Sequence, residues 1–466
     1  MSTEHVVGRT SSEPSPNHGL DALSMLTVYM VLLLAIPSYL IVTPLGSLGK
    51  PAFLWGLLLA VWWALHQLQA RSMPVESPHQ PVRFAFVVLI VIALVSFAAA
   101  MLRGQPFDQV SPAQSGLLRL VSWGGVLFVV LDGIQNLRDL MTLVRRFVLA
   151  VSLVAFLGLL QFATRQSLVD RLTIPGMSAS EVGGAQVRGG FIRAASTATH
   201  PLEYGTLLSL GLPLALAYGS GLGGARRVSP AIWRWAPTAI ISVAALVSTS
   251  RSAVLGFAVG IIVTVPGLPR RLRRTIVACG TVLVGFVLVA VPGMFATMRQ
   301  LFTGVSSDPS AQSRSGALAK APGFIAASPI FGTGFGTFLP RYYIFDNEWV
   351  LLTIELGVVG VIAFAALVGT AAWSALWARR ISGATDVQVL GQALAASVLA
   401  GVVTLAGFDG LSFPISAGAL FICIGMCGAL RTSVLVDQAD ELPISTLALA
   451  SRSWPAAPTQ RRDPMS

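Results

Sequence analysis

Long runs of apolar residues alternate with short polar connections along most of the chain. Most of these runs approach the roughly 20 residues that a helix needs to cross a bilayer, where only helices and closed barrels satisfy their own backbone hydrogen bonds. The pattern therefore predicts an all-α polytopic membrane protein with about twelve transmembrane helices. The runs lie at residues 22–43, 52–69, 84–102, 117–131, 144–163, 201–219, 235–249, 252–267, 275–292, 348–372, 388–407 and 411–430.

The composition supports this fold class and argues against a soluble enzyme. Hydrophobic residues make up 54% of the 466 residues, charged residues make up 11%, and the mean hydropathy is +0.74. Soluble domains have about 25% charged residues. The formal net charge is +11. The basic residues are spread over many connections and form no patch interleaved with aromatic residues, so nucleic acid is not an expected partner.

Polar segments flank the predicted membrane domain, which spans residues 22–430. Residues 1–21 lack the pattern of a signal peptide, and residues 431–466 are also polar, so both ends are expected to be disordered. With a cytoplasmic N-terminus, alternate connections carry most of the arginines, as the positive-inside rule requires. Both termini are therefore expected in the cytoplasm. The inward-facing arginines are Arg71, Arg83, Arg138, Arg145, Arg146, Arg226, Arg227, Arg234, Arg270, Arg271, Arg273, Arg274, Arg379 and Arg380.

Two connections on the outward side are long, at about 164–200 and 293–347. Structureless connections of this length are uncommon inside a compact domain and are usually functional when they occur. Both also contain arginines that the positive-inside rule would not place there. These are Arg165, Arg171, Arg188 and Arg193 in the first loop, and Arg299, Arg314 and Arg341 in the second.

Two features inside the second loop predict local structure. Residues 311–327 have a helix-forming composition and are expected to form an amphipathic helix in the plane of the membrane interface, ended by Pro329. The segment PIFGTGFGTF that follows alternates glycine with Thr and Phe. No strand precedes it, so it is not a dinucleotide-binding fingerprint. We expect a tight backbone passage against the membrane or a substrate, with a flexible turn as the alternative.

An arginine lies where two membrane helices are predicted to meet. Arg251 stands in the segment STSRS, inside the apolar stretch 236–266. A membrane arginine is energetically costly and usually faces a polar cavity or a partner. The alternative is a tight hairpin of two short helices, with Arg251 extended toward the interface. Because Arg251 is predicted on the same side as both long loops, we expect their arginines to converge on one outward face.

Several outward arginines around a membrane site suit a phosphorylated lipid. A guanidinium presents a planar fork of donors that matches phosphate. Fixed cations also stabilise the negative charge that develops on a leaving diphosphate during sugar transfer. A nearby carboxylate or imidazole would accept the proton of the attacking hydroxyl.

The candidate bases are few, and each has a structural interpretation as well. Asp346 comes just before a predicted helix and is a candidate N-cap. His200 precedes Pro201, which is typical of a helix start, so capping is an alternative there too. The polar residues at these two helix starts are His200, Glu203, Asp346, Asn347 and Glu348.

The remaining polar and cysteine residues of the apolar segments are interpreted as structural. Glu355 is a buried carboxylate that needs a partner, and Asp409 fits a turn. Cys279, Cys423 and Cys427 are interpreted as small hydrophobic residues, not as a disulfide framework. The sequence contains no cysteine and histidine cluster and no paired aspartates, so neither a metal nor another cofactor is expected.

Three segments carry a family resemblance in their order and spacing. They are SRSAVLGFAVG from residue 250, SPIFGTGFGTF from residue 328 and DNEWVLLTIELGVVGVIAF from residue 346, with RAASTATHPLEYG upstream. Together they resemble the O-antigen ligase and O-antigen polymerase-like family of bacterial surface-polysaccharide enzymes. The resemblance covers roughly Arg188 to Phe364, whereas the first five predicted helices match only as generic membrane spans.

The resemblance implies a GT-C-like, metal-independent glycosyltransferase in the bacterial cytoplasmic membrane, with its active face outward. Its donor would be an undecaprenyl-diphosphate-linked glycan, and its acceptor a glycan or a lipid-linked glycan. Arg251 and either Arg188 or Arg193 would hold the diphosphate, next to membrane lipid. A chain-length regulator and a flippase are the candidate protein partners. The other expected substrate contacts are His200, Glu203, Arg314, Arg341, Asn347 and Glu348.

One position departs from the family pattern. In the ligases a histidine commonly precedes the asparagine of the third motif and is taken as the base, whereas this chain has Asp346 there. The departure argues against lipid A-core ligation and favours polymerisation or transfer to another acceptor. An aspartate can fill the same role if its surroundings raise its pKa.

Two other function classes fit a chain of many helices. A transporter of a glycan or small solute would show related halves with interrupted helices, and we find no internal repeat. A cell-wall glycan polymerase of the shape–elongation–division type would need a catalytic aspartate in a large outer loop, for which Asp308 is the other candidate. The transferase is the favoured interpretation.

Overall fold

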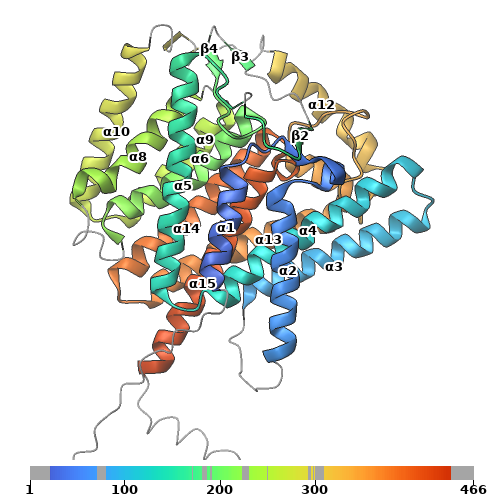
Figure 1. The fold of residues 1–466 in the computed structure, drawn as a ribbon, viewed down its shortest axis with the longest axis horizontal. Coiled ribbons are helices and arrows are strands. Elements are labelled where there is room, and N and C mark those ends of the chain that lie inside the picture. The colour runs from blue at the N-terminus through green and yellow to red at the C-terminus, as the bar shows by residue number, and fades with distance from the viewer. Residues whose placement is uncertain are drawn as a thin grey trace, which may run out of the picture.

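Helices make up most of the computed structural model, which describes residues 21–70, 80–169, 172–180, 186–188, 191–222, 230–248, 250–291, 295–296, 299 and 309–441. Figure 1 shows them as one bundle. The helices are α1 (Ala22–Leu34), α2 (Pro51–Ala70), α3 (Pro81–Leu102), α4 (Phe107–Gly133), α5 (Leu137–Thr164), α6 (Pro201–Gly219), α8 (Ala231–Val247), α9 (Arg251–Thr264), α10 (Arg270–Ala290), α12 (Pro309–Ile325), α13 (Glu348–Ile381), α14 (Thr385–Thr404) and α15 (Pro414–Glu441).

The apolar pattern predicts these helices well. Every predicted run overlaps one of them, and α12 lies in the second long loop, close to the helix predicted at 311–327. Eight of the described helices are long and apolar enough to cross a membrane, and three more apolar helices are shorter. The all-α polytopic membrane fold is therefore confirmed.

Short strands and 3-10 turns occur only between helices in the described part of the chain. The strand β1 (Leu40–Val42) pairs antiparallel with β2 (Met177–Ala179), and β3 (Gln186–Arg188) pairs antiparallel with β4 (Phe191–Arg193). The first pair ties the connection after α1 to the first long loop. The 3-10 turns are η1 (Thr43–Leu48), η3 (Val265–Gly267), η4 (Leu405–Gly407) and η5 (Gly410–Ser412).

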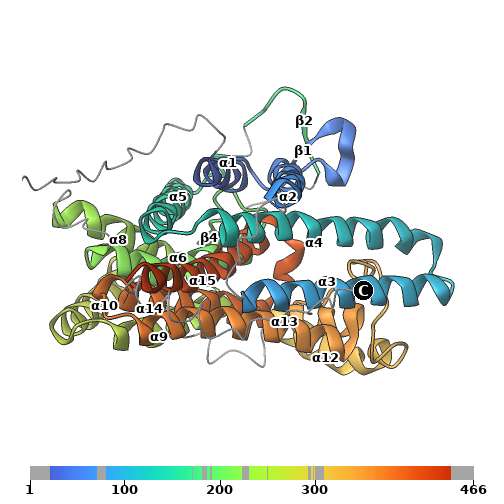
Figure 2. The same cartoon turned by 90° about the horizontal axis from the view of Figure 1, so that it is seen from below.

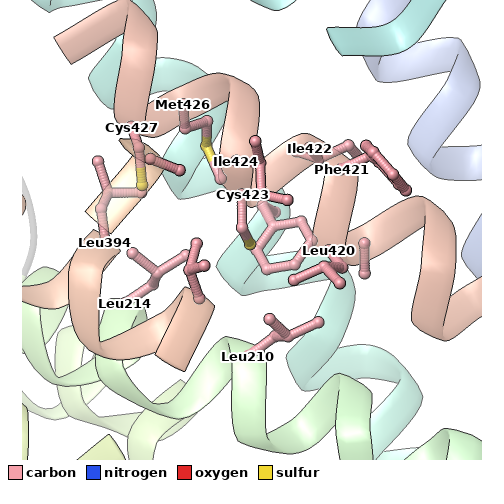
Figure 3. Packing of buried hydrophobic residues seen from close by; sticks show 14 of the residues in the cluster. Leu210, Leu214, Leu394, Leu420, Phe421, Ile422, Cys423, Ile424, Met426 and Cys427 are labelled. Atoms are coloured by element: carbon pink, nitrogen blue, oxygen red, sulfur yellow. The ribbon is translucent and has the colours of Figure 1, made fainter. Parts of the chain in front are cut away.

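The helix α15 runs through the middle of the bundle. Figure 2 shows it between α1 and α5 on one side and α13 and α14 on the other, and it packs against all four. Its Cys423 and Cys427 are buried free thiols among leucines of α6 and α14, as Figure 3 shows. These two cysteines are therefore packed as small hydrophobic residues, whereas the free thiol of Cys279 lies exposed on α10.

The C-terminal boundary of the membrane domain differs from the prediction. The helix α15 continues to Glu441, whereas an unstructured tail was expected from residue 431. Arg431 stacks on the rings of Trp373 and Trp377 of α13, at 4.8 and 4.3 Å, and Val434 is buried. These contacts hold the added turns, because a cation over an aromatic face is attracted to it. The predicted disorder of residues 1–20 and 442–466 lies outside the described residues.

The two long connections lie at the same end of the bundle. In Figure 1, β2, β3, β4 and α12 stand at the top, while the last turns of α15 project from the bottom. The first loop runs from the end of α5 to the start of α6, and the second from the end of α10 to the start of α13. The helices that begin after these loops therefore start at this end.

Candidate functional site

The start of α9 positions Arg251. Ser250 is the N-cap of α9, and its Oγ accepts a hydrogen bond from the amide of Ala253 at 3.5 Å. Arg251 is the first helical residue and is half-buried. Arg251 therefore stands at the N-terminal end of an apolar helix that packs mainly on α6 and α14.

The start of α6 is held by its own polar residues. His200 is the N-cap, and its Nδ1 accepts a hydrogen bond from the amide two residues along at 3.1 Å. Glu203 is fully buried. Its carboxylate accepts hydrogen bonds from Ser38 Oγ (3.1 Å) and from the amides of Thr199 (2.9 Å) and Ile415 (2.7 Å). Glu203 thus joins the β1 region, the first loop, α6 and α15, so its observed contacts are structural.

The segment from β4 to α6 is anchored to two other helices. It begins at Arg193, which is buried at 8% exposure. The amide of Ser196 donates to Gln161 Oε1 of α5 at 2.7 Å, which supports the left-handed φ of 55° at this residue. Thr197 Oγ1 donates to the carbonyl of Leu34 at 2.8 Å. These bonds fix the path of the chain between Arg193 and α6.

The start of α13 corrects one capping prediction. Asn347, not Asp346, is the N-cap, because its side-chain oxygen accepts hydrogen bonds from the amides two and three residues along, at 3.0 and 3.3 Å. Both residue types are good caps, so the sequence alone does not decide between neighbours. Glu348 is buried, and its Oε2 accepts a hydrogen bond from the amide of Leu411 at 2.8 Å, while its own amide donates to Phe408 at 3.2 Å.

The loop from η4 to the start of α15, residues 405–413, touches the starts of two helices. Gly407 packs so closely on α9 that an added Cβ would lie 2.5 Å from the Cβ of Ser252. The next residue, Phe408, accepts the backbone hydrogen bond from Glu348 of α13. The loop therefore brings the residue after Arg251 and the residue after Asn347 against neighbouring positions.

The start of α6 meets the same loop. A Cβ on Gly205 would lie 2.8 Å from that of Ala253, and the ring of His200 lies 6.0 Å from the ring of Phe413. The N-terminal ends of α6, α9 and α13 therefore gather around residues 405–413. Each helix carries one of the polar segments singled out in the sequence.

The structure does not place the other three predicted arginines at these helix starts. Arg188 lies in β3 and Arg314 in α12, but their side chains are outside the described part of the chain. Arg341 is at the surface, where it forms an ion pair with Asp108 and donates a hydrogen bond to Tyr342 Oη at 3.1 Å. Hydrogen bonds from Gln109 and Arg341 lower the pKa of Tyr342. The observed contacts of Arg341 therefore hold the second loop against α4.

The glycine-rich segment packs into a break in α13. The helix is interrupted at Gly357, whose φ is 70°. The amide of Gly334 donates to the carbonyl of Glu355 at 2.8 Å, and the amide of Val358 donates to that of Pro329 at 3.0 Å. The segment is a tight backbone passage, as predicted, but it packs on α13, whereas the membrane or a substrate was the expected partner.

The same segment supplies partners for the buried Glu355. Its Oε1 accepts a hydrogen bond from the amide of Phe338 at 3.1 Å, and the charge of Arg119 on α4 acts on the carboxylate. Arg119 also lies 5.5 Å from the ring centre of Phe335. The sequence interpretation missed Arg119, although a charge inside the apolar run 117–131 was a usable signal.

A cavity of about 490 Å³ opens beside the start of α13. Its walls come from α1, α2, α4, α13, the second loop and residues 409–414. Of the predicted site residues whose side chains the structure describes, only Glu348 lines it. Arg193, Arg251 and Asp346 are not among its lining residues, although Phe345 and Glu348 on either side of Asp346 are. The charged side chains in the lining are Lys50, Arg119, Glu348, Glu355 and Asp409.

Comparison with known proteins adds a family. Residues 236–365 match the family model described as O-antigen ligase. The match runs from α8 into α13, and it includes Arg251, the glycine-rich segment and Asp346. No curated protein matches the chain.

The matched region and the fold agree on the class of protein. The match supports a glycosyltransferase-like enzyme that acts in polysaccharide assembly, and the apolar helices make it a membrane protein. The chain is a polytopic membrane protein, and its residues 236–365 are similar to the O-antigen ligase family.

Proposed function

We propose that this protein is a polymerase or ligase of exported polysaccharide. It transfers a glycan from an undecaprenyl-diphosphate-linked donor to a sugar hydroxyl on the outer face of the cytoplasmic membrane. The observation that carries the proposal is the meeting of three helix N-termini, those of α6, α9 and α13, around residues 405–413.

This arrangement suits a diphosphate. A helix N-terminus carries about half a positive charge and attracts anions. Arg251 adds a full charge and a planar fork of donors at the first position of α9. Arg193, buried at the entry to the segment before α6, is the second proposed diphosphate contact. Such fixed cations stabilise the leaving diphosphate more than the bound donor.

Asp346 is the proposed base. It stands just before the N-cap of α13, so its carboxylate is carried by the same helix start that approaches residues 405–413. In the reaction the acceptor oxygen bonds to the anomeric carbon while the bond from that carbon to the diphosphate oxygen breaks. The electron pair leaves with the diphosphate, and the hydroxyl proton goes to Asp346.

The proposed orientation puts this end of the bundle outside the cell. The two long connections share that end, while α15 ends at the other (Figure 1). The basic starts of α5 and α10, with Arg138 and Arg270, fit the cytoplasmic side under the positive-inside rule.

Glycan profiling of a deletion strain tests the proposal. Wild-type protein should restore long polymer, whereas Arg251→Ala should not, although it reaches the membrane in equal amount. Arg270→Ala is the matched control, because Arg270 is also the first residue of an apolar helix but is exposed. Single lipid-linked repeats in the deletion strain indicate a polymerase, and unattached polymer indicates a ligase. Full polymer with Arg251→Ala would remove the core of the proposal.

A further inference from the structure

The cavity beside α13 has the lining of a sugar site. Serine hydroxyls stand around it, together with aromatic rings that include Tyr29, Trp123 and Tyr343. Its volume falls within the range of roughly 300–1,000 Å³ that is usual for small-molecule sites. Sugars offer hydroxyls for hydrogen bonding and apolar faces for packing on rings. The lining serines are Ser47, Ser111, Ser115, Ser122, Ser180 and Ser412.

Several of these hydroxyls are held in place and keep acceptor capacity. Ser115 Oγ donates to the carbonyl of Ser111 at 3.0 Å, and Ser122 Oγ donates to that of Phe53 at 2.9 Å. Ser180 Oγ donates to a backbone carbonyl at 2.8 Å. A hydroxyl that donates in this way still has lone pairs that can accept from a sugar hydroxyl.

The charges of the lining disfavour a diphosphate. Both cations act on carboxylates: Arg119 on Glu355 and Glu348, and Lys50 on Glu203. With Asp409, the lining has three carboxylates and two cations. Carboxylates accept hydrogen bonds from sugar hydroxyls, whereas they repel phosphate.

We propose that this cavity binds the acceptor sugar of the transfer, an inference that rests on the function proposed above. Residues 405–413 connect the start of α9 with the cavity: Gly407 packs on Ser252, next to Arg251, and Asp409 and Leu411 line the cavity. Glu348 belongs to both, because it lines the cavity and follows Asn347.

The position of the cavity fits an inverting transfer. The acceptor oxygen then bonds to the anomeric carbon from the face opposite the breaking bond to the diphosphate. In the proposed arrangement the diphosphate is held at the start of α9, and the acceptor approaches from the cavity. The released electron pair stays on the diphosphate, and the hydroxyl proton passes to Asp346, the proposed base at the start of α13.

The assignment is tested by measuring oligosaccharide binding to a variant in which a bulky side chain fills the cavity. The probe is the repeat-unit oligosaccharide, released by mild acid from the cell's lipid-linked pool. Its contact with the purified full-length protein is measured by saturation-transfer NMR. Ser115→Phe places a ring in the cavity and should abolish binding. Gln114→Phe is the matched control, because Gln114 is the exposed neighbour on α4 and does not line the cavity. Ser115→Ala, which leaves the cavity open, should still bind the oligosaccharide.

The outcomes separate this proposal from the proposed function. Arg251→Ala should keep oligosaccharide binding while polymer formation is lost. Binding to Ser115→Phe at the wild-type level, with wild-type thermal stability, would overturn the assignment, and so would failure of the wild-type protein to bind. In a transfer assay Ser115→Phe should raise KM for the acceptor alone. A rise in KM for the donor alone would indicate that the cavity binds the donor glycan, and it would also contradict the proposal.

Discussion

The break in α13 offers a sharp test of how the site is built. At Gly357 the backbone has φ 70° and ψ −175°, a region that is essentially restricted to glycine. A Cβ at this position would also lie 2.0 Å from the carbonyl oxygen of Ile330. Gly357→Ala must therefore strain the helix and push the glycine-rich segment away from it.

Two costs add in this variant. Holding a residue other than glycine in such a backbone conformation costs about 1–3 kcal/mol. Displacing a well-packed backbone costs about 1–3 kcal/mol more. Gly357→Ala should thus lower the free energy of unfolding by about 2–6 kcal/mol. The hydrogen bond between the amide of Val358 and the carbonyl of Pro329, now 3.0 Å, is expected to break first.

Thermal unfolding in detergent, followed by tryptophan fluorescence, measures the effect. Gly369→Ala in the same helix is the matched control, because Gly369 has helical geometry and nothing lies within 4 Å of an added Cβ. That change should raise stability by roughly 0.5–1 kcal/mol. If Gly357→Ala melts at or above the wild-type temperature, the docked segment does not hold the break, and this reasoning is refuted.

Three further changes have expected outcomes. Asp346→Asn should lose turnover in a transfer assay but keep binding to the lipid-linked donor in a pull-down; loss of both would make the residue structural. Glu203→Ala should lower the melting temperature, because it leaves the buried amide of Ile415 without its acceptor, at about 1–3 kcal/mol, and removes one of the two acceptors of the Thr199 amide. Glu203→Gln, which keeps one acceptor oxygen, should lose less, and an equal loss would point to the charge. EDTA should not inhibit transfer, and inhibition that magnesium restores would argue against the proposed mechanism.

Elements with a local cause were predictable from the sequence. Hydrophobic runs determine where helices form, so every predicted run overlaps a helix. Capping at His200 follows from its place before Pro201. At Asp346 and Asn347 two adjacent residues of good capping type compete for the same role, and the sequence does not say that Asn347 fills it.

Features made by distant segments were not predictable. Gly357 lies in a run that favours helix, and only the docked segment around Ile330 explains the break. Arg119 could have been noticed as a charge in an apolar run, but its place beside Glu355 depends on how α4 packs near α13. The cavity is likewise formed by α1, α2, α4 and α13 together, and no single stretch of sequence encodes it.

Transfer by the purified protein in liposomes is the most direct measurement of the central claim, that Arg251 and the surrounding helix starts hold a lipid-linked diphosphate during glycan transfer. The donor is an undecaprenyl-diphosphate repeat unit, and mass spectrometry follows released undecaprenyl diphosphate together with the joined glycan. The wild-type protein should produce both, and Arg251→Ala should produce neither. Passage of the intact donor across the bilayer without release, or undiminished release by Arg251→Ala, would contradict the account.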